Sequence, residues 1–79
     1  MKNAIVKQKY STLYVVMPFT QLNSFLLLEF CSIHDIRMIE AQLHNPDEVG
    51  RPDTLVVLFK DQVQADYEQC VAYINKNQH

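Results

Sequence analysis

The sequence has almost no glycine, and it lacks the glycine-rich loops that hold phosphate groups. Gly50 is the only glycine among 79 residues. Known phosphate-binding loops need several glycines at close spacing, because their backbone approaches the phosphates where a Cβ would not fit. The single glycine therefore excludes a nucleotide-binding cradle of that kind. The G-x-S-x-G turn that presents a catalytic serine is also missing.

Long apolar runs are missing as well. The longest compact apolar block, FLLLEF at 25–30, is interrupted by Glu29. A membrane-spanning helix needs about 20 consecutive apolar residues. The first ten residues are polar and carry lysines, whereas a signal peptide has an apolar central segment. We therefore expect a cytoplasmic protein that makes no membrane contact.

Cysteine is scarce, and its positions argue against a disulfide framework. Cys31 and Cys70 both fall within apolar helical patterns. There they are expected to serve as small buried side chains in a reducing compartment. A disulfide joining two helices is the alternative, which two cysteines alone do not establish. The length of 79 residues predicts one small domain spanning 1–79.

Basic residues are few, and three of the seven fall close together at one end of the chain. The net charge is −2, and Lys2, Lys7 and Lys9 all fall within the first ten residues. The rest of the chain is acidic. A nucleic-acid-binding domain normally carries a basic patch on its folded body. Since the basic segment here is a terminus, the sequence predicts that nucleic acid is not a partner.

The first half of the chain predicts a strand followed by a helix. Ser11–Met17 is rich in branched and aromatic residues, as strands are. Alternation places Leu13, Val15 and Met17 on one side of that strand and Tyr14 and Val16 on the other. Pro18 is expected to end the strand. Thr20 is expected to cap a helix over Gln21–Ile33.

The second half predicts two strands and a second helix. Ile36–His44 alternates like a half-exposed strand, and Thr54–Lys60 is apolar on both sides. A loop containing Gly50 and two prolines joins them. Asp61 is expected to cap the last helix, in which apolar residues recur at helical spacing. These apolar residues are Val63, Tyr67, Cys70, Val71 and Ile74.

The element order β-α-β-β-α predicts an α+β protein. Right-handed crossover places both helices on the same sheet face. The expected architecture is a two-layer sandwich with an antiparallel or mixed three-stranded sheet, close to a ferredoxin-like fold that lacks its last strand. Residues 1–9 either fray or add a strand. A hairpin there is not favoured, because no glycine or Asn-Gly turn precedes Ser11.

Two helices on one face leave the other sheet face uncovered. The uncovered face is either the one that bears Tyr14, Val16, Val56 and Leu58 or, if the helices pack on that side, the opposite one. An apolar face of that kind needs a partner, and the simplest one is a second copy of the chain. The leading hypothesis is therefore a non-catalytic, homodimeric interaction protein that acts as an adaptor or modulator of another protein. The alternative is a sensor domain for an apolar or amino-acid-like small molecule.

The loop between the two later strands is the second candidate surface for a partner. It is longer than a hairpin requires, and it holds Asp47, Glu48 and Arg51. The planar guanidinium of Arg51 suits a carboxylate or phosphate on a partner protein.

Two clusters contain residue types found in chemical sites, but neither is expected to form one. Cys31 and His34 are three residues apart on a helix, with Asp35 next to them, as a nucleophile and base require. His44, Asp47, Glu48 and Asp53 surround the loop but lack the spacing of calcium or zinc sites. The sequence therefore predicts no catalytic residue, no metal and no cofactor.

Overall fold

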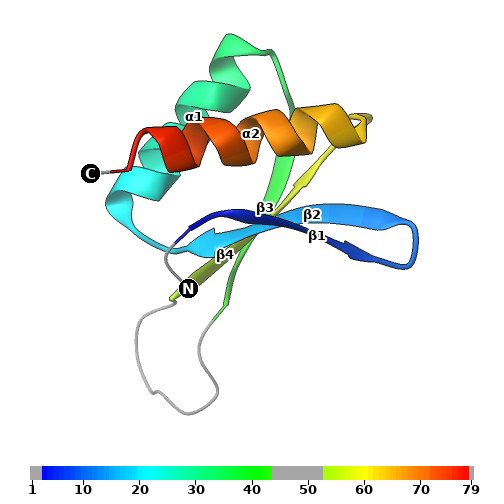
Figure 1. Ribbon diagram of the computed structural model, residues 1–79, viewed down its shortest axis with the longest axis horizontal. Coiled ribbons are helices and arrows are strands. Elements are labelled where there is room, and N and C mark those ends of the chain that lie inside the picture. Colours follow the sequence, from blue (N-terminus) through cyan, green and yellow to red (C-terminus); the bar gives the residue numbers. More distant parts are fainter. Residues whose placement is uncertain (1–2, 44–52, 79) are drawn as a thin grey trace.

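The computed structural model describes residues 3–43 and 53–78 (Figure 1). The elements in chain order are β1 (Ile5–Lys9), β2 (Thr12–Pro18), α1 (Gln21–Ile33), β3 (Met38–Leu43), β4 (Thr54–Phe59) and α2 (Gln64–Lys76). The α+β class is confirmed. The order is β-β-α-β-β-α, because an additional strand precedes those predicted.

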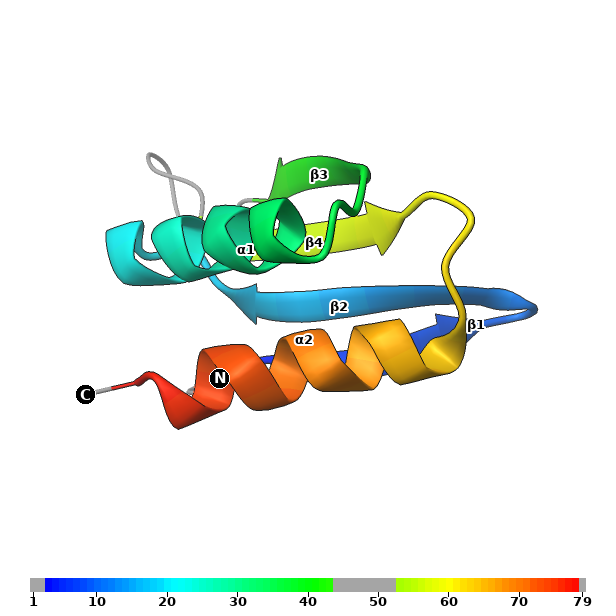
Figure 2. The ribbon, with the colours of Figure 1, turned by 90° about the horizontal axis from the view of Figure 1, so that it is seen from above.

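The strands form one antiparallel sheet, and both helices lie on the same side of it (Figure 2). The sheet has four strands in the order β1-β2-β4-β3, so the prediction of three strands was wrong. The arrangement is also not that of a ferredoxin-like chain lacking its last strand, because the edge beside β2 is occupied by β1 from the N-terminus.

The sequence did not favour the β1–β2 hairpin, because its turn contains no glycine. Lys9 pairs with Thr12, which leaves only Tyr10 and Ser11 for the turn. Tight hairpin turns need a positive φ, which glycine and asparagine adopt most easily. Here Tyr10 takes a φ of 57° and leaves its side chain in solvent. Asp35 and Asp61 adopt similar angles in other turns, so among the described residues these left-handed positions are occupied by residues other than glycine.

Helix α1 begins and ends where the sequence predicted. The Thr20 hydroxyl accepts a hydrogen bond from the Asn23 backbone N–H at 3.0 Å, as an N-cap side chain does. The Asn23 side chain is buried and donates to the Pro18 carbonyl at 2.8 Å. Pro18 itself pairs with Thr54, so β2 includes the proline that was expected to follow it.

The start of α2 differs from the prediction. Asp61 lies in the turn after β4, and the N-cap is Val63. The carboxylate of Asp66 accepts a hydrogen bond from the Val63 N–H at 3.2 Å. Asp61 was the nearest polar residue to the end of the strand, but its positive φ is used to turn the chain and the helix starts later.

The core lies between the helices and one sheet face. Val15, Met17, Leu55 and Val57 supply the sheet side of this core. The helices supply Leu26, Leu27, Phe30, Tyr67, Cys70 and Ile74. The predicted apolar stripe of the last helix is thus buried at Tyr67, Cys70 and Ile74, whereas Val63 is exposed.

Polar side chains join distant parts of this core. The Asn75 amide of α2 accepts from the Ala4 N–H at 2.9 Å and donates to the Ala4 carbonyl at 3.0 Å, so it holds the chain just before β1. The Tyr73 hydroxyl of α2 donates to Glu29 of α1. This hydrogen bond, together with partial burial and the negative charge of Glu29, raises the pKa of Tyr73. The half-buried Glu29 thereby gains a partner.

Candidate functional site

The sheet face opposite the helices, here called the open face, is apolar at its centre. Residues that pair across antiparallel strands lie on the same side of the sheet. Val16 pairs with Ile5 and Val56, and Leu58 pairs with Ile39. These residues alternate with the core residues Val15 and Val57, so they lie on the side away from the helices.

Exposure varies across the open face. Val16 is buried by its neighbours, and Tyr14, Val56 and Leu58 are half-buried. The most exposed large residues are on β3, where Ile39 is 56% and Leu43 is 48% exposed. The structure thus brings together Tyr14, Val16, Val56 and Leu58, the candidate partner-binding residues of the strands.

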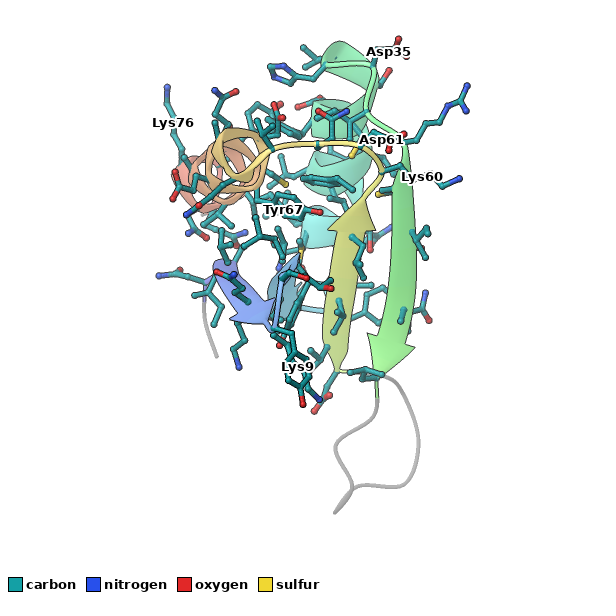
Figure 3. All side chains as sticks on the ribbon, turned by 90° about the vertical axis from the view of Figure 1, so that its right-hand side faces the viewer. Lys9, Asp35, Lys60, Asp61, Tyr67 and Lys76 are labelled. Carbon is teal, nitrogen blue, oxygen red and sulfur yellow. The ribbon has the colours of Figure 1, made fainter. Side chains whose placement is uncertain are left out.

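Basic side chains surround this apolar centre. Lys7 pairs with Tyr14 and Lys9 pairs with Thr12, so both lysines alternate to the open face. At the other side, the Lys60 N–H donates to the Arg37 carbonyl at 2.9 Å, which continues the β3–β4 pairing by one step beyond Met38 and Phe59. All four side chains are exposed. Figure 3 shows Lys9 and Lys60 on the side of the sheet away from α2.

The acidic side chains of the described strands and helices lie elsewhere, whereas Asp35, Asp53 and Asp61 lie in the segments next to the strands, and the Asp53 carboxylate accepts a hydrogen bond from the Thr54 hydroxyl. Glu40 is the one acidic residue within the strands, and it pairs with the core residue Val57, so it alternates to the helix-facing side. Glu29, Asp66 and Glu68 are on the helices. The described strands therefore place lysines but no carboxylate on the open face.

This charge distribution corrects the reading of the N-terminal lysines. The sequence suggested that they belong to a terminus and not to the folded body. The structure incorporates them into β1, next to β2, and sets Lys7 directly across from Tyr14. Sequence reasoning missed this because the hairpin turn carries no glycine signal.

Helix α1 presents a second apolar surface. Leu22, Phe25, Leu28 and Ile33 are all exposed on this helix. The helix is apolar nearly all round, but it is buried only on the side that meets α2 and the sheet.

The candidate residues of the loop lie outside the described residues. These are Asp47, Glu48 and Arg51, together with His44 of the metal alternative. Asp53 is described, and its backbone N–H donates to the Leu43 carbonyl at 3.0 Å at the start of β4. Among residues 3–43 and 53–78, no group of three or more His, Cys, Asp or Glu side chains is placed to hold a metal ion.

The geometry at Cys31 is that of a buried core thiol. Its Sγ lies 3.7 Å from the Met38 Sδ, and the His34 ring stacks on Phe30 with centroids 4.3 Å apart. Burial raises the pKa of Cys31. Burial and the neighbouring Cys31 together raise the pKa of Cys70 to about 12. A reactive thiol requires the opposite shift, since the thiolate is the nucleophile.

We expect both thiols to react slowly with a maleimide or disulfide reagent in the folded protein. Burial limits access, and the raised pKa values keep the thiols protonated near neutral pH. The rate should rise sharply on unfolding in guanidinium, which serves as the control. Rapid labelling of Cys31 that is lost in a His34→Ala variant would instead identify an activated cysteine.

Two further observations complete the site. Within the described part of the chain, no helix is both long enough and apolar enough to cross a membrane. Comparison of the chain with protein-family models, with curated proteins and with solved structures found no match. The open face is therefore interpreted from its own geometry and charge.

Proposed function

We propose that this chain is a non-catalytic interaction protein that modulates another protein through its open face. The observation that carries the proposal is an apolar sheet face that the helices leave uncovered, bordered by Lys7, Lys9, Arg37 and Lys60. Contiguous exposed apolar surface with a polar rim is typical of interaction sites. These four basic side chains at the border favour a partner that carries negative charge.

The occupant that fits best is a segment of another protein that combines aliphatic and acidic side chains. Its aliphatic groups would contact Val56 and Leu58, and its carboxylates would reach the basic side chains at the border. Complementary charge of this kind contributes mainly to association rate and to partner selection. The apolar contacts supply the larger share of the affinity.

Single-stranded nucleic acid fits the centre of this face less well. Sheet surfaces that bind bases stack them on aromatic rings. The open face offers Tyr14, but its neighbours Val16, Val56 and Leu58 are aliphatic. Aliphatic side chains do not provide the flat π surface on which bases stack.

A second copy stacked face to face, as the sequence suggested, also fits the charge less well. Stacking would bring two sets of basic side chains to one interface, with no carboxylate from either set of described strands to offset them. Like charges at an interface are destabilising. The homodimer remains a proposal, and its geometry is taken up below. The small-molecule sensor remains a prediction of the sequence alone.

A binding assay with defined probes tests the open face. The probe is a short fluorescent peptide of alternating glutamate and valine, and its matched control alternates lysine and valine. We expect the acidic peptide to bind and the basic one not to bind. The double variant Lys7→Gln, Lys60→Gln should weaken binding roughly three- to tenfold, because exposed ion pairs contribute about 0.2–1 kcal/mol each.

Lys76→Gln is the matched control variant, since Lys76 lies on α2, away from the open face (Figure 3). It removes one positive charge without touching the site, and binding should be unchanged. Equal binding of both peptides, or an equal effect of Lys76→Gln, would contradict the proposal. Tighter binding of an oligothymidylate than of the acidic peptide would favour nucleic acid instead.

A further inference from the structure

Strand β3 forms an outer edge of the described sheet. The backbone N–H and C=O groups of every second residue in β3 point outward from the sheet. The Arg37 carbonyl accepts from Lys60, and the Leu43 carbonyl accepts from Asp53, so the odd-numbered residues here face β4. In an antiparallel edge strand, the residues between them face outward. Met38, Glu40 and Gln42 therefore direct their N–H and C=O groups outward, where a further strand could pair with them.

The two edges of the sheet differ in how they discourage such pairing. β1 carries Lys7 and Lys9, and charged side chains, lysine above all, protect an edge from pairing. β3 contains neither lysine nor proline. Its open-face residues are Ile39, Ala41 and Leu43, all exposed. β3 has one charged side chain, Glu40, and its open-face side is apolar, so it is the less protected of the two edges and a template for another strand.

We propose that β3 pairs antiparallel with β3 of a second copy of this chain, about a two-fold axis that passes at Ala41. The pairing joins two four-stranded sheets into one continuous sheet. It makes about four backbone hydrogen bonds through Glu40 and Gln42 of each copy. The open faces of the two copies then form one surface on the same side.

The register follows from the side chains. Two symmetric alignments of the paired β3 strands keep both open faces on the same side and give the longest overlap. In one the two-fold axis passes at Glu40, and in the other it passes at Ala41. The register centred on Glu40 sets the two Glu40 carboxylates opposite each other, and directly opposed like charges are destabilising. The register centred on Ala41 sets Glu40 opposite Gln42 of the second copy. The glutamine amide can then donate to the carboxylate.

The open-face side chains favour the same register. Centring on Ala41 places Ile39 opposite Leu43 of the second copy, and the reverse pair forms by symmetry. These are the two most exposed large residues of the open face. Cross-strand aliphatic pairs contribute roughly 0.2–1 kcal/mol each, so both pairs support the same alignment.

Helix α1 fits this arrangement as well. It lies over β4 on the side toward β3 (Figure 2). Two copies of α1 would then be about 14 Å apart, three strand spacings. Leu28 precedes Cys31 by about one turn, and the Cys31 thiol contacts Met38 of β3. Leu28 is 58% exposed, and pairing would place it in the narrow space between the helices.

This inference rests on β3 and not on the identity of a partner at the open face. If the peptide assay fails, the strand pairing is unaffected, and the reverse also holds. The two proposals are compatible, because edge pairing leaves the open face accessible.

Cysteine cross-linking tests the register. In an Ala41→Cys variant, the two introduced thiols face each other in a closely spaced pair, and mild oxidation should link nearly all of the protein as dimers. The native thiols Cys31 and Cys70 are buried and should not compete. Ile39→Cys is the matched control, since in this register Ile39 lies opposite Leu43 of the second copy. Cross-linking of Ile39→Cys in place of Ala41→Cys would overturn the proposed register.

A charge test supplies an independent readout. Gln42→Lys sets two Glu–Lys pairs across the axis and should lower the dimer dissociation constant roughly three- to tenfold, whereas Gln42→Glu should raise it by a similar factor. In the register centred on Glu40, residue 42 lies opposite Met38 of the second copy. Neither Gln42→Lys nor Gln42→Glu would then change the dimer dissociation constant in this way. Light scattering that shows wild-type and Gln42→Lys proteins as monomers at high micromolar concentration would refute the dimer.

Discussion

A Phe30→Ala variant should lose about 3–5 kcal/mol of unfolding free energy. Phe30 is the largest of the fully buried side chains, and its ring meets three others. The ring centroids lie 4.3 Å from His34, 5.6 Å from Tyr73 and 6.5 Å from Phe59. A chain of 79 residues has roughly 4–12 kcal/mol of stability in total. The variant should therefore lose a large fraction of the total stability.

Phe25→Ala is the matched control for this experiment. Phe25 is on the same helix and undergoes the same chemical change, but its side chain is 59% exposed. Its loss should change the unfolding free energy by less than about 1 kcal/mol. Urea denaturation followed by circular dichroism measures both variants. Similar midpoints for the two would mean that α1 meets the sheet through a different face.

A Tyr67→Phe variant should lose about 2–3 kcal/mol, although it removes only one oxygen atom. The Tyr67 hydroxyl lies 3.1 Å from both the backbone N–H and the carbonyl of Phe59, accepting from one and donating to the other. The pairing of β2 with β4 ends at Val57, so the hydroxyl replaces a strand neighbour at this point. Without it, two buried backbone groups lose their partner, and that cost is larger than the average value of a hydrogen bond.

Tyr73→Phe is the corresponding control. Its hydroxyl donates to Glu29 at a half-buried position, where water can replace the lost partner. The expected loss is about 0.5–1 kcal/mol. Thermal melts of the two variants should therefore separate clearly. If Tyr67→Phe melts with the wild type, the end of β4 must have another source of hydrogen bonds.

The two proposals together describe a small scaffold with separate surfaces for separate tasks. The β3 edge would join two copies, and the open face would contact an acidic partner. The continuous open face of such a dimer would present the border of Lys7, Lys9, Arg37 and Lys60 twice, which would increase the apparent affinity for a partner with two acidic segments.

Local chemistry in the sequence determined much of the secondary structure. Pro18 and Thr20 mark the start of α1, whose bounds match the prediction. The alternation in β2 and the branched residues of β4 identified both strands and which side chains share a face, whereas the structure decided which face the helices cover. These features could be predicted because each depends on residues within a few positions of one another. The placement of Tyr14, Val16, Val56 and Leu58 on one face follows from the same alternation.

The tertiary structure alone decided what lies beside those elements. β1 becomes a strand because Tyr10 accepts a positive φ and because Asn75, 71 residues along the chain, binds Ala4. The pairing of β1 with β2 places Lys7 and Lys9 at the border of the open face. It also covers β2, so the two edges of the described sheet are β1, which carries lysines, and β3, which carries none. Contacts between residues far apart in the chain leave no periodic pattern in the sequence. The charge of the open face and the position of β3 at an edge of the described sheet therefore became visible only in the folded protein.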